Sequence, residues 1–105
     1  MAWLYLVVAG FLEIGWPLGL KMAESSDRRV QGILTAVFFM AASGTFLWLA
    51  QRQIPMGTAY AVWTGIGAAG AAILGIALLG ESAAPIRILC IVLILAGVIG
   101  LKQVS

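Results

Sequence analysis

The chain has 105 residues, of which 63% are hydrophobic and 10% are charged, and its formal net charge is +2. Its mean hydropathy is +1.10, and because soluble domains carry about 25% charged residues, this composition excludes an ordinary soluble fold. The few cations form no basic stripe of the kind that binds nucleic acid, so we expect them to contact lipid headgroups and to influence orientation in the membrane.

Four apolar runs separated by short polar breaks predict four transmembrane helices in one domain that spans residues 1–105. A helix needs about 20 apolar residues to cross about 30 Å of hydrocarbon, so a chain of this length holds four spans and little else. The expected helices cover about 2–20, 31–50, 57–79 and 85–103. The predicted fold class is therefore an all-α membrane protein with short loops between antiparallel neighbours.

The first run contains a single charged residue, Glu13, within the otherwise uncharged residues 1–20. An ionisable group at membrane depth costs several kcal/mol and usually marks an ion, proton or substrate path. Gly10 and Trp16 share its helix face; the glycine leaves space and the indole offers an N–H. Pro17 lacks the N–H that would bond the Glu13 carbonyl. We therefore predict a site at Glu13 that includes Trp16.

The second and third runs offer candidate partners for this carboxylate. Ser43 is a lone hydroxyl that either bonds back to its own helix or donates to Glu13, and the residues alone leave both alternatives open. Tyr60 and Trp63 lie three positions apart and share a face. They would form either an aromatic wall for a cation or an ordinary packed core, and neither alternative is preferred from the residues alone.

Glycines interrupt the third run near its middle, at Gly65, Gly67 and Gly70. Such a cluster predicts either a bend or a close approach of neighbouring helices. The fourth run contains the one cysteine, Cys90, which we expect to be a packing residue. The sequence has no histidine, no CxxC motif and no carboxylate cluster, so we predict neither a metal site nor a nucleophilic triad.

The basic residues are divided between the two membrane faces that four spans define. One face is expected to carry four cations and the other two, which are Lys21, Arg28, Arg29 and Arg87 against Arg52 and Lys102. The positive-inside rule acts weakly on so small a difference. Insertion in both orientations is therefore physically plausible.

Several segments together resemble the small multidrug resistance family from end to end. They are Gly10-x-x-Glu13-x-x-Trp16, the run from Pro55 to Ala68, Gly80-Glu81-Ser82, and Gly97-x-x-Gly100-Leu101-Lys102. Trp16 and the stretch GTAYAVWTGIGA resemble the guanidinium-exporter subtype more than the exporters of quaternary ammonium drugs. Pro17 departs from the small or apolar residue usual in that subtype, which puts the presentation of Glu13 in question.

The resemblance implies an antiparallel, dual-topology homodimer in which the first three helices line a central site and the fourth dimerises. It assigns substrate and proton binding to Glu13. The residues expected to support the substrate are Trp16, Ser43, Tyr60 and Trp63. The glycines expected to serve as hinge or packing positions are Gly10, Gly65, Gly67 and Gly97.

The implied function is proton-coupled export of guanidinium and small singly substituted guanidinium cations across the bacterial inner membrane, without a cofactor and without catalysis. Two Glu13 carboxylates in one dimer cavity would repel each other, so at least one should hold a proton near neutral pH. Guanidinium N–H groups match a carboxylate, so substrate and protons would compete for the same groups.

Three alternatives stay open. The same fold could export quaternary ammonium or other lipophilic cationic drugs. The chain could instead be a small pore-forming or regulatory membrane subunit, in which Glu13 serves selectivity or assembly. It could also work only beside a paralogous partner of opposite orientation. Saturable flux that strictly exchanges protons distinguishes a carrier from a pore.

Overall fold

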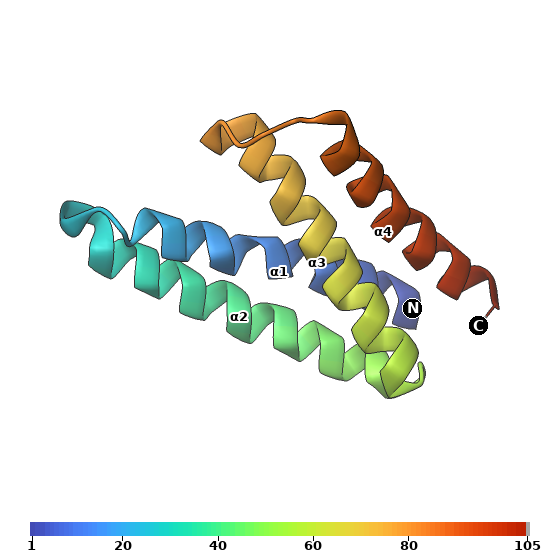
Figure 1. Ribbon diagram of the computed structural model, residues 1–105. Helices are drawn as coiled ribbons and strands as arrows, with labels where there is room; N and C mark the ends of the chain where they lie inside the picture. Colours follow the sequence, from blue (N-terminus) through green and yellow to red (C-terminus); the bar gives the residue numbers. More distant parts are fainter. Residues whose placement is uncertain (105) are drawn as a thin grey trace.

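The computed structural model describes residues 1–104, which form four long helices and one short 3-10 turn (Figure 1). The elements are α1 (Ala2–Met22), η1 (Ser26–Arg28), α2 (Arg29–Gln51), α3 (Met56–Leu79) and α4 (Pro85–Val104). All four helices are long and apolar enough to cross a membrane, which confirms the predicted all-α membrane fold. Each predicted helix end lies within two residues of the observed end.

The helices form a thin, open assembly that measures 45 × 34 × 17 Å. The helices α1 and α2 lie side by side and antiparallel, α3 crosses them at an angle, and α4 packs along α3 (Figure 1). Toward their C-terminal ends, α1 and α3 diverge. In α4 only Ile91 is buried, so this helix presents almost its whole surface to its surroundings.

Two glycines bring the backbones of α1 and α2 into contact near the loop that joins them. A Cβ atom added at Gly19 would lie 2.8 Å from the carbonyl oxygen of Gly32, and one added at Gly32 would lie 2.5 Å from the carbonyl oxygen of Gly19. Neither position tolerates a side chain without a shift of the backbone. Small residues at a membrane helix interface allow such an approach, and this contact sets the spacing of α1 and α2.

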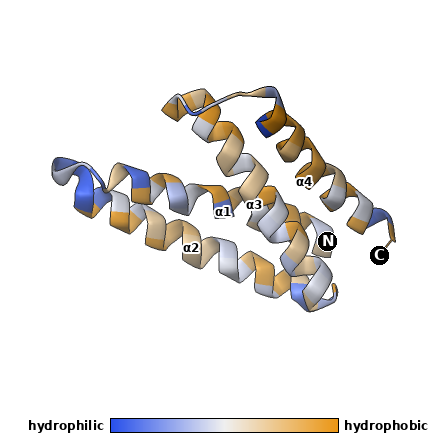
Figure 2. Cartoon of the chain, viewed as in Figure 1, coloured by the Kyte–Doolittle hydropathy of each residue, from blue (hydrophilic) through white to orange (hydrophobic). Residues whose placement is uncertain are grey.

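The buried core is small and lies mainly where the start of α1 meets the connection between α2 and α3. Its members are Ala2, Leu6, Ala50, Ile54, Ala59 and Val62. Large apolar side chains cover the outer surface instead, and Phe38 and Trp48 are more than 60% exposed. Figure 2 shows apolar residues along the helices and hydrophilic ones near their ends. This distribution is typical of a protein whose outer surface contacts lipid or a second subunit.

The helix α3 is unbroken at Gly65 and Gly67, so these glycines do not divide it into two segments. They instead allow neighbouring helices to come close. A Cβ atom at Gly67 would lie 2.6 Å from Cγ of Glu13 on α1, and one at Gly65 would lie 2.5 Å from Cγ2 of Val98 on α4. Of the two predicted alternatives, close helix approach is observed at both glycines.

Candidate functional site

Glu13 lies in the middle of α1, and its half-buried side chain faces α3. Two glycines provide the space for this arrangement. Gly67 of α3 accommodates the Glu13 side chain, whereas Gly10 of α1 accommodates Ile66 of α3, whose Cβ would lie 2.7 Å from a Cβ added at Gly10. The helix α1 continues through Pro17 without a break. One glycine on each helix therefore allows α3 to pass directly over the carboxylate.

A fully buried hydroxyl connects the three helices at this point. The Ser43 hydroxyl on α2 donates to the carbonyl oxygen of Ala9 at 2.7 Å and lies 3.3 Å from Oε1 of Glu13. The indole N–H of Trp63 on α3 donates to the same Ser43 oxygen at 2.8 Å. A serine has one proton to donate, so the shorter bond to Ala9 is its main one and Glu13 is a weaker second acceptor. Of the two predicted alternatives for Ser43, the contact with Glu13 is present.

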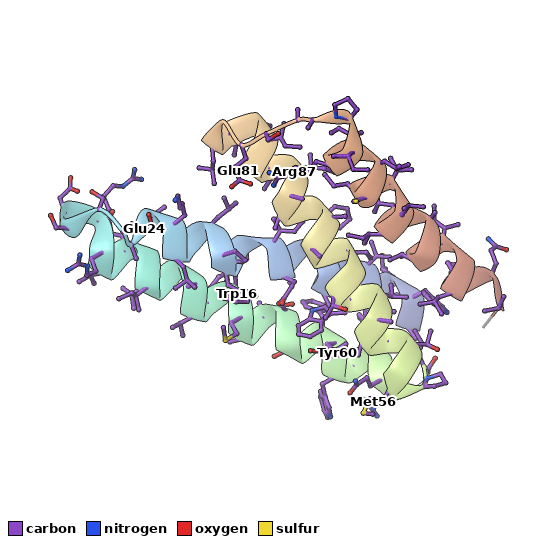
Figure 3. All side chains as sticks on the ribbon, viewed as in Figure 1. Trp16, Glu24, Met56, Tyr60, Glu81 and Arg87 are labelled. Atoms are coloured by element: carbon purple, nitrogen blue, oxygen red, sulfur yellow. The ribbon has the colours of Figure 1, made fainter. Side chains whose placement is uncertain are left out.

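An aromatic wall stands beside the carboxylate. The rings of Tyr60 and Trp63 have their centroids 5.3 Å apart, and together with Glu13 and Trp16 they line a cavity of about 350 Å³. Figure 3 shows Trp16 and Tyr60 near the middle of the molecule. Within residues 1–104, the Trp16 indole N–H has no hydrogen-bond partner. It remains available to a molecule in the cavity.

A second cavity of about 210 Å³ adjoins the first one and shares Glu13, Trp16 and Thr64 with it. We did not predict a role for Thr64. Its hydroxyl donates to the carbonyl oxygen of Tyr60 at 2.8 Å, so it is satisfied within α3. The sequence feature that could have indicated Thr64 as a lining residue is its position four residues after Tyr60, which places both on one face of α3.

No cation pairs with Glu13 within the described part of the chain. The two ion pairs within residues 1–104 join Lys21 to Glu24 at 3.2 Å and Arg87 to Glu81 at 2.6 Å, and both lie near helix ends. Residues 1–104 also contain no group of three or more possible metal ligands. A carboxylate at membrane depth, bordered by aromatic rings and without a cationic partner, suits a positively charged guest.

The structure thus brings five of the predicted residues together, namely Glu13, Trp16, Ser43, Tyr60 and Trp63. Gly97 lies elsewhere, on the exposed surface of α4, where a Cβ atom would have no neighbour within 4 Å. Gly100 on the same helix is equally open. These two glycines take no part in the cavity around Glu13.

A family profile described as "Small Multidrug Resistance protein" matches residues 1–94. The chain belongs to the Small Multidrug Resistance family. This Small Multidrug Resistance protein is 58% identical to a "Guanidinium exporter" of Yersinia pseudotuberculosis over 105 residues, which is the full length of both chains. It is 52% identical to a protein of the same name from Citrobacter freundii and 49% identical to one from Escherichia coli K12, in each case over 97% of this chain and 96% of the relative. The predicted family is confirmed, and the chain is a multi-pass membrane protein.

Proposed function

We propose that this Small Multidrug Resistance protein exports guanidinium and small singly substituted guanidinium cations in exchange for protons. The observation that carries the proposal is the Glu13 carboxylate, which has no cationic partner and faces a cavity bordered by Trp16, Tyr60 and Trp63. Relatives that are 49–58% identical over nearly their whole length bear the name "Guanidinium exporter", which supports the same cargo here.

The geometry suits a planar cation with several N–H groups. Ser43 contacts only Oε1 of Glu13, so Oε2 remains available to a guanidinium N–H, and charge-assisted bonds of this kind are short and strong. The face of the guanidinium would stack on Tyr60 or Trp63, as guanidinium groups do on aromatic rings. The Ser43 and Trp63 bonds would hold the carboxylate in place while the cargo binds.

Proton coupling follows from a proposed antiparallel homodimer of dual topology, in which two Glu13 carboxylates share one cavity. Burial and mutual repulsion disfavour two ionised carboxylates, so protons bind in the absence of cargo and leave when a cation arrives. Gly65 and Gly67 would serve as the hinge in α3, and α4 with Gly97 would supply the dimer contact. The proposed location is the bacterial inner membrane. The proposed exchange involves no cofactor and no chemical conversion of the cargo.

Export of quaternary ammonium drugs is the second candidate. A tetraalkylammonium ion has no N–H group, so it would leave Oε2 of Glu13 without a hydrogen bond. A site that provides hydrogen-bond partners rejects ligands that cannot use them. The Ser43 network around Glu13 therefore favours guanidinium over a tetraalkylammonium ion.

The experiment compares proton-gradient-driven uptake of guanidinium and of tetraethylammonium into liposomes that contain the purified protein. Guanidinium uptake that Glu13→Gln abolishes is the expected result. Asp27→Asn is the matched control, because it removes a carboxylate from the exposed loop after α1. Preference for tetraethylammonium would indicate a drug exporter, whereas the absence of proton-coupled flux of either ion would indicate a pore or a chain that needs a paralogous partner.

A further inference from the structure

The connection between α3 and α4 holds a carboxylate against the side of α3. Gly80 ends the helix in the left-handed conformation, with φ of 69°, and the next N–H, that of Glu81, donates to the carbonyl oxygen of Gly75 at 3.1 Å. The Glu81 carboxylate then covers Gly75 so closely that a Cβ atom there would lie 2.5 Å from Oε1. The carboxylate therefore has a defined place beside α3.

Glu81 already holds a guanidinium group that the chain itself supplies. Nη2 of Arg87, in the first turn of α4, donates to Oε1 of Glu81 at 2.6 Å, and Figure 3 shows both residues where α3 connects to α4. The two side chains are 35% and 43% exposed, so water and small solutes reach the pair. An ion pair of this exposure exchanges partners readily, because solvent screens its attraction.

Two cavities with shared lining residues, together called the groove below, lie between Glu81 and Glu13. An outer cavity of about 320 Å³ lies between the diverging C-terminal halves of α1 and α3, and Glu81 is part of its wall. Pro17 and Ala71 line this cavity and also the 210 Å³ cavity that contains Glu13. The two spaces therefore adjoin along the same pair of helices.

The charges at the outer cavity balance. Among residues 1–104, the only other charged residue that lines it is Lys21, and Lys21 is paired with Glu24 at 3.2 Å. Arg87 neutralises Glu81 in the same way. A cation that replaces Arg87 would therefore lie at the outer end of the groove, where the Glu81 carboxylate already supplies the negative charge that it needs.

We propose that Glu81 is an outer binding site for guanidinium cations on their way to or from Glu13, and that the cargo displaces Arg87 from it. This inference rests on the proposed function. When the cargo binds, the Arg87 head group turns into water, and the cation then passes along the groove beside Pro17 and Ala71. Release from Glu13 toward the same side follows the reverse order, in which Arg87 returns to Glu81 and frees the cargo.

Two substitutions that break the same ion pair distinguish this role from a purely structural one. Glu81→Gln removes the outer site, and we expect kcat/KM for guanidinium uptake in liposomes to fall at least about threefold, by loss of electrostatic capture. Arg87→Gln leaves Glu81 without its competitor, and we expect kcat/KM to rise. The double variant should behave like Glu81→Gln. If the ion pair only stabilises the loop, kcat/KM should change in the same direction in both single variants.

Controls separate this proposal from the proposed function. Asp27→Asn removes one negative charge from the loop between α1 and α2, and it should leave kcat/KM unchanged. Equilibrium binding of guanidinium at Glu13, measured on detergent-purified protein, should be equal in all variants, since Glu13 is intact, and gel filtration checks that each variant is folded. If the wild-type protein fails to bind and transport guanidinium, the proposed function is wrong. If the wild type transports it but the two single variants change alike, or neither changes, the outer site is refuted.

Discussion

The indole N–H of Trp63 on α3 donates a hydrogen bond to Oγ of Ser43 on α2 across 2.8 Å. Ser43 also contacts α1, because its hydroxyl donates to the carbonyl oxygen of Ala9 and lies 3.3 Å from Oε1 of Glu13. One buried oxygen therefore joins the three helices that border the cavity. Because buried polar groups that lose their partners cost about 1–3 kcal/mol, changes at either end of this network should be measurable.

Ser43→Ala should weaken guanidinium binding about tenfold, which corresponds to about 1.4 kcal/mol, a typical value for one lost buried hydrogen bond. The substitution removes the contact with Glu13 and leaves the Trp63 N–H without an acceptor. Calorimetric titration of the purified protein with guanidinium measures the change. Thr45→Ala is the matched control on α2, because its exposed hydroxyl donates only to the Ala41 carbonyl of the same helix. Equal affinities of the Ser43→Ala variant and the wild type would rule out a positioning role for the hydroxyl.

Trp63→Phe and Trp63→Ala should weaken guanidinium binding by different amounts. Phenylalanine keeps an aromatic face next to Tyr60 but loses the N–H that bonds Ser43. Alanine loses both, and the missing cation–π contact should cost a further 0.5–2 kcal/mol, roughly. Dissociation constants for guanidinium measure the two steps, with Trp48→Phe at an exposed position on α2 as the control. If both Trp63 variants bind guanidinium equally, the ring face contributes nothing.

Gly67→Ala should abolish transport, because the new Cβ would lie 2.6 Å from Cγ of Glu13. Either the Glu13 side chain turns away or α3 shifts, and overpacking of this kind costs about 1–3 kcal/mol. Gly57→Ala is the control on the same helix. It meets nothing within 4 Å, and a tolerated glycine-to-alanine change stabilises a helix by about 0.5–1 kcal/mol. Guanidinium uptake and the thermal midpoint of each variant test both expectations, and full uptake by Gly67→Ala would contradict them.

Gly97→Leu should separate the proposed dimer while the four-helix fold persists. Within one chain the position is open, so the larger side chain meets no intramolecular obstacle, whereas a partner helix packed there would be pushed away. The molar mass in detergent, measured by light scattering, should fall from that of a dimer to that of a monomer. Ile99→Leu, at an exposed position of α4, keeps the side-chain volume and should leave the mass unchanged. A dimeric Gly97→Leu variant would place the subunit contact elsewhere.

The four helices and the importance of Glu13 could be predicted from the sequence, since both depend on the contrast between charge and hydrocarbon. The thickness of the bilayer sets the length of an apolar run, and a lone carboxylate within such a run is visible without any structure. The spacing of three and four residues also placed Trp16 beside Glu13, and Tyr60 beside Trp63, because neighbours on one helix share a face.

Only the tertiary structure decided which residues of different helices meet. Ser43 had two possible acceptors until the packing of α2 against α1 was known. The glycines of α3 predicted either a bend or a close contact, and the crossing of α1 and α3 showed the close contact at Gly67. The ion pair between Glu81 and Arg87 was equally hidden, because periodicity describes a single helix and carries no information about the angle between two. That angle depends on packing at Gly10, Gly67 and similar positions, where a missing side chain on one helix admits a particular atom of another.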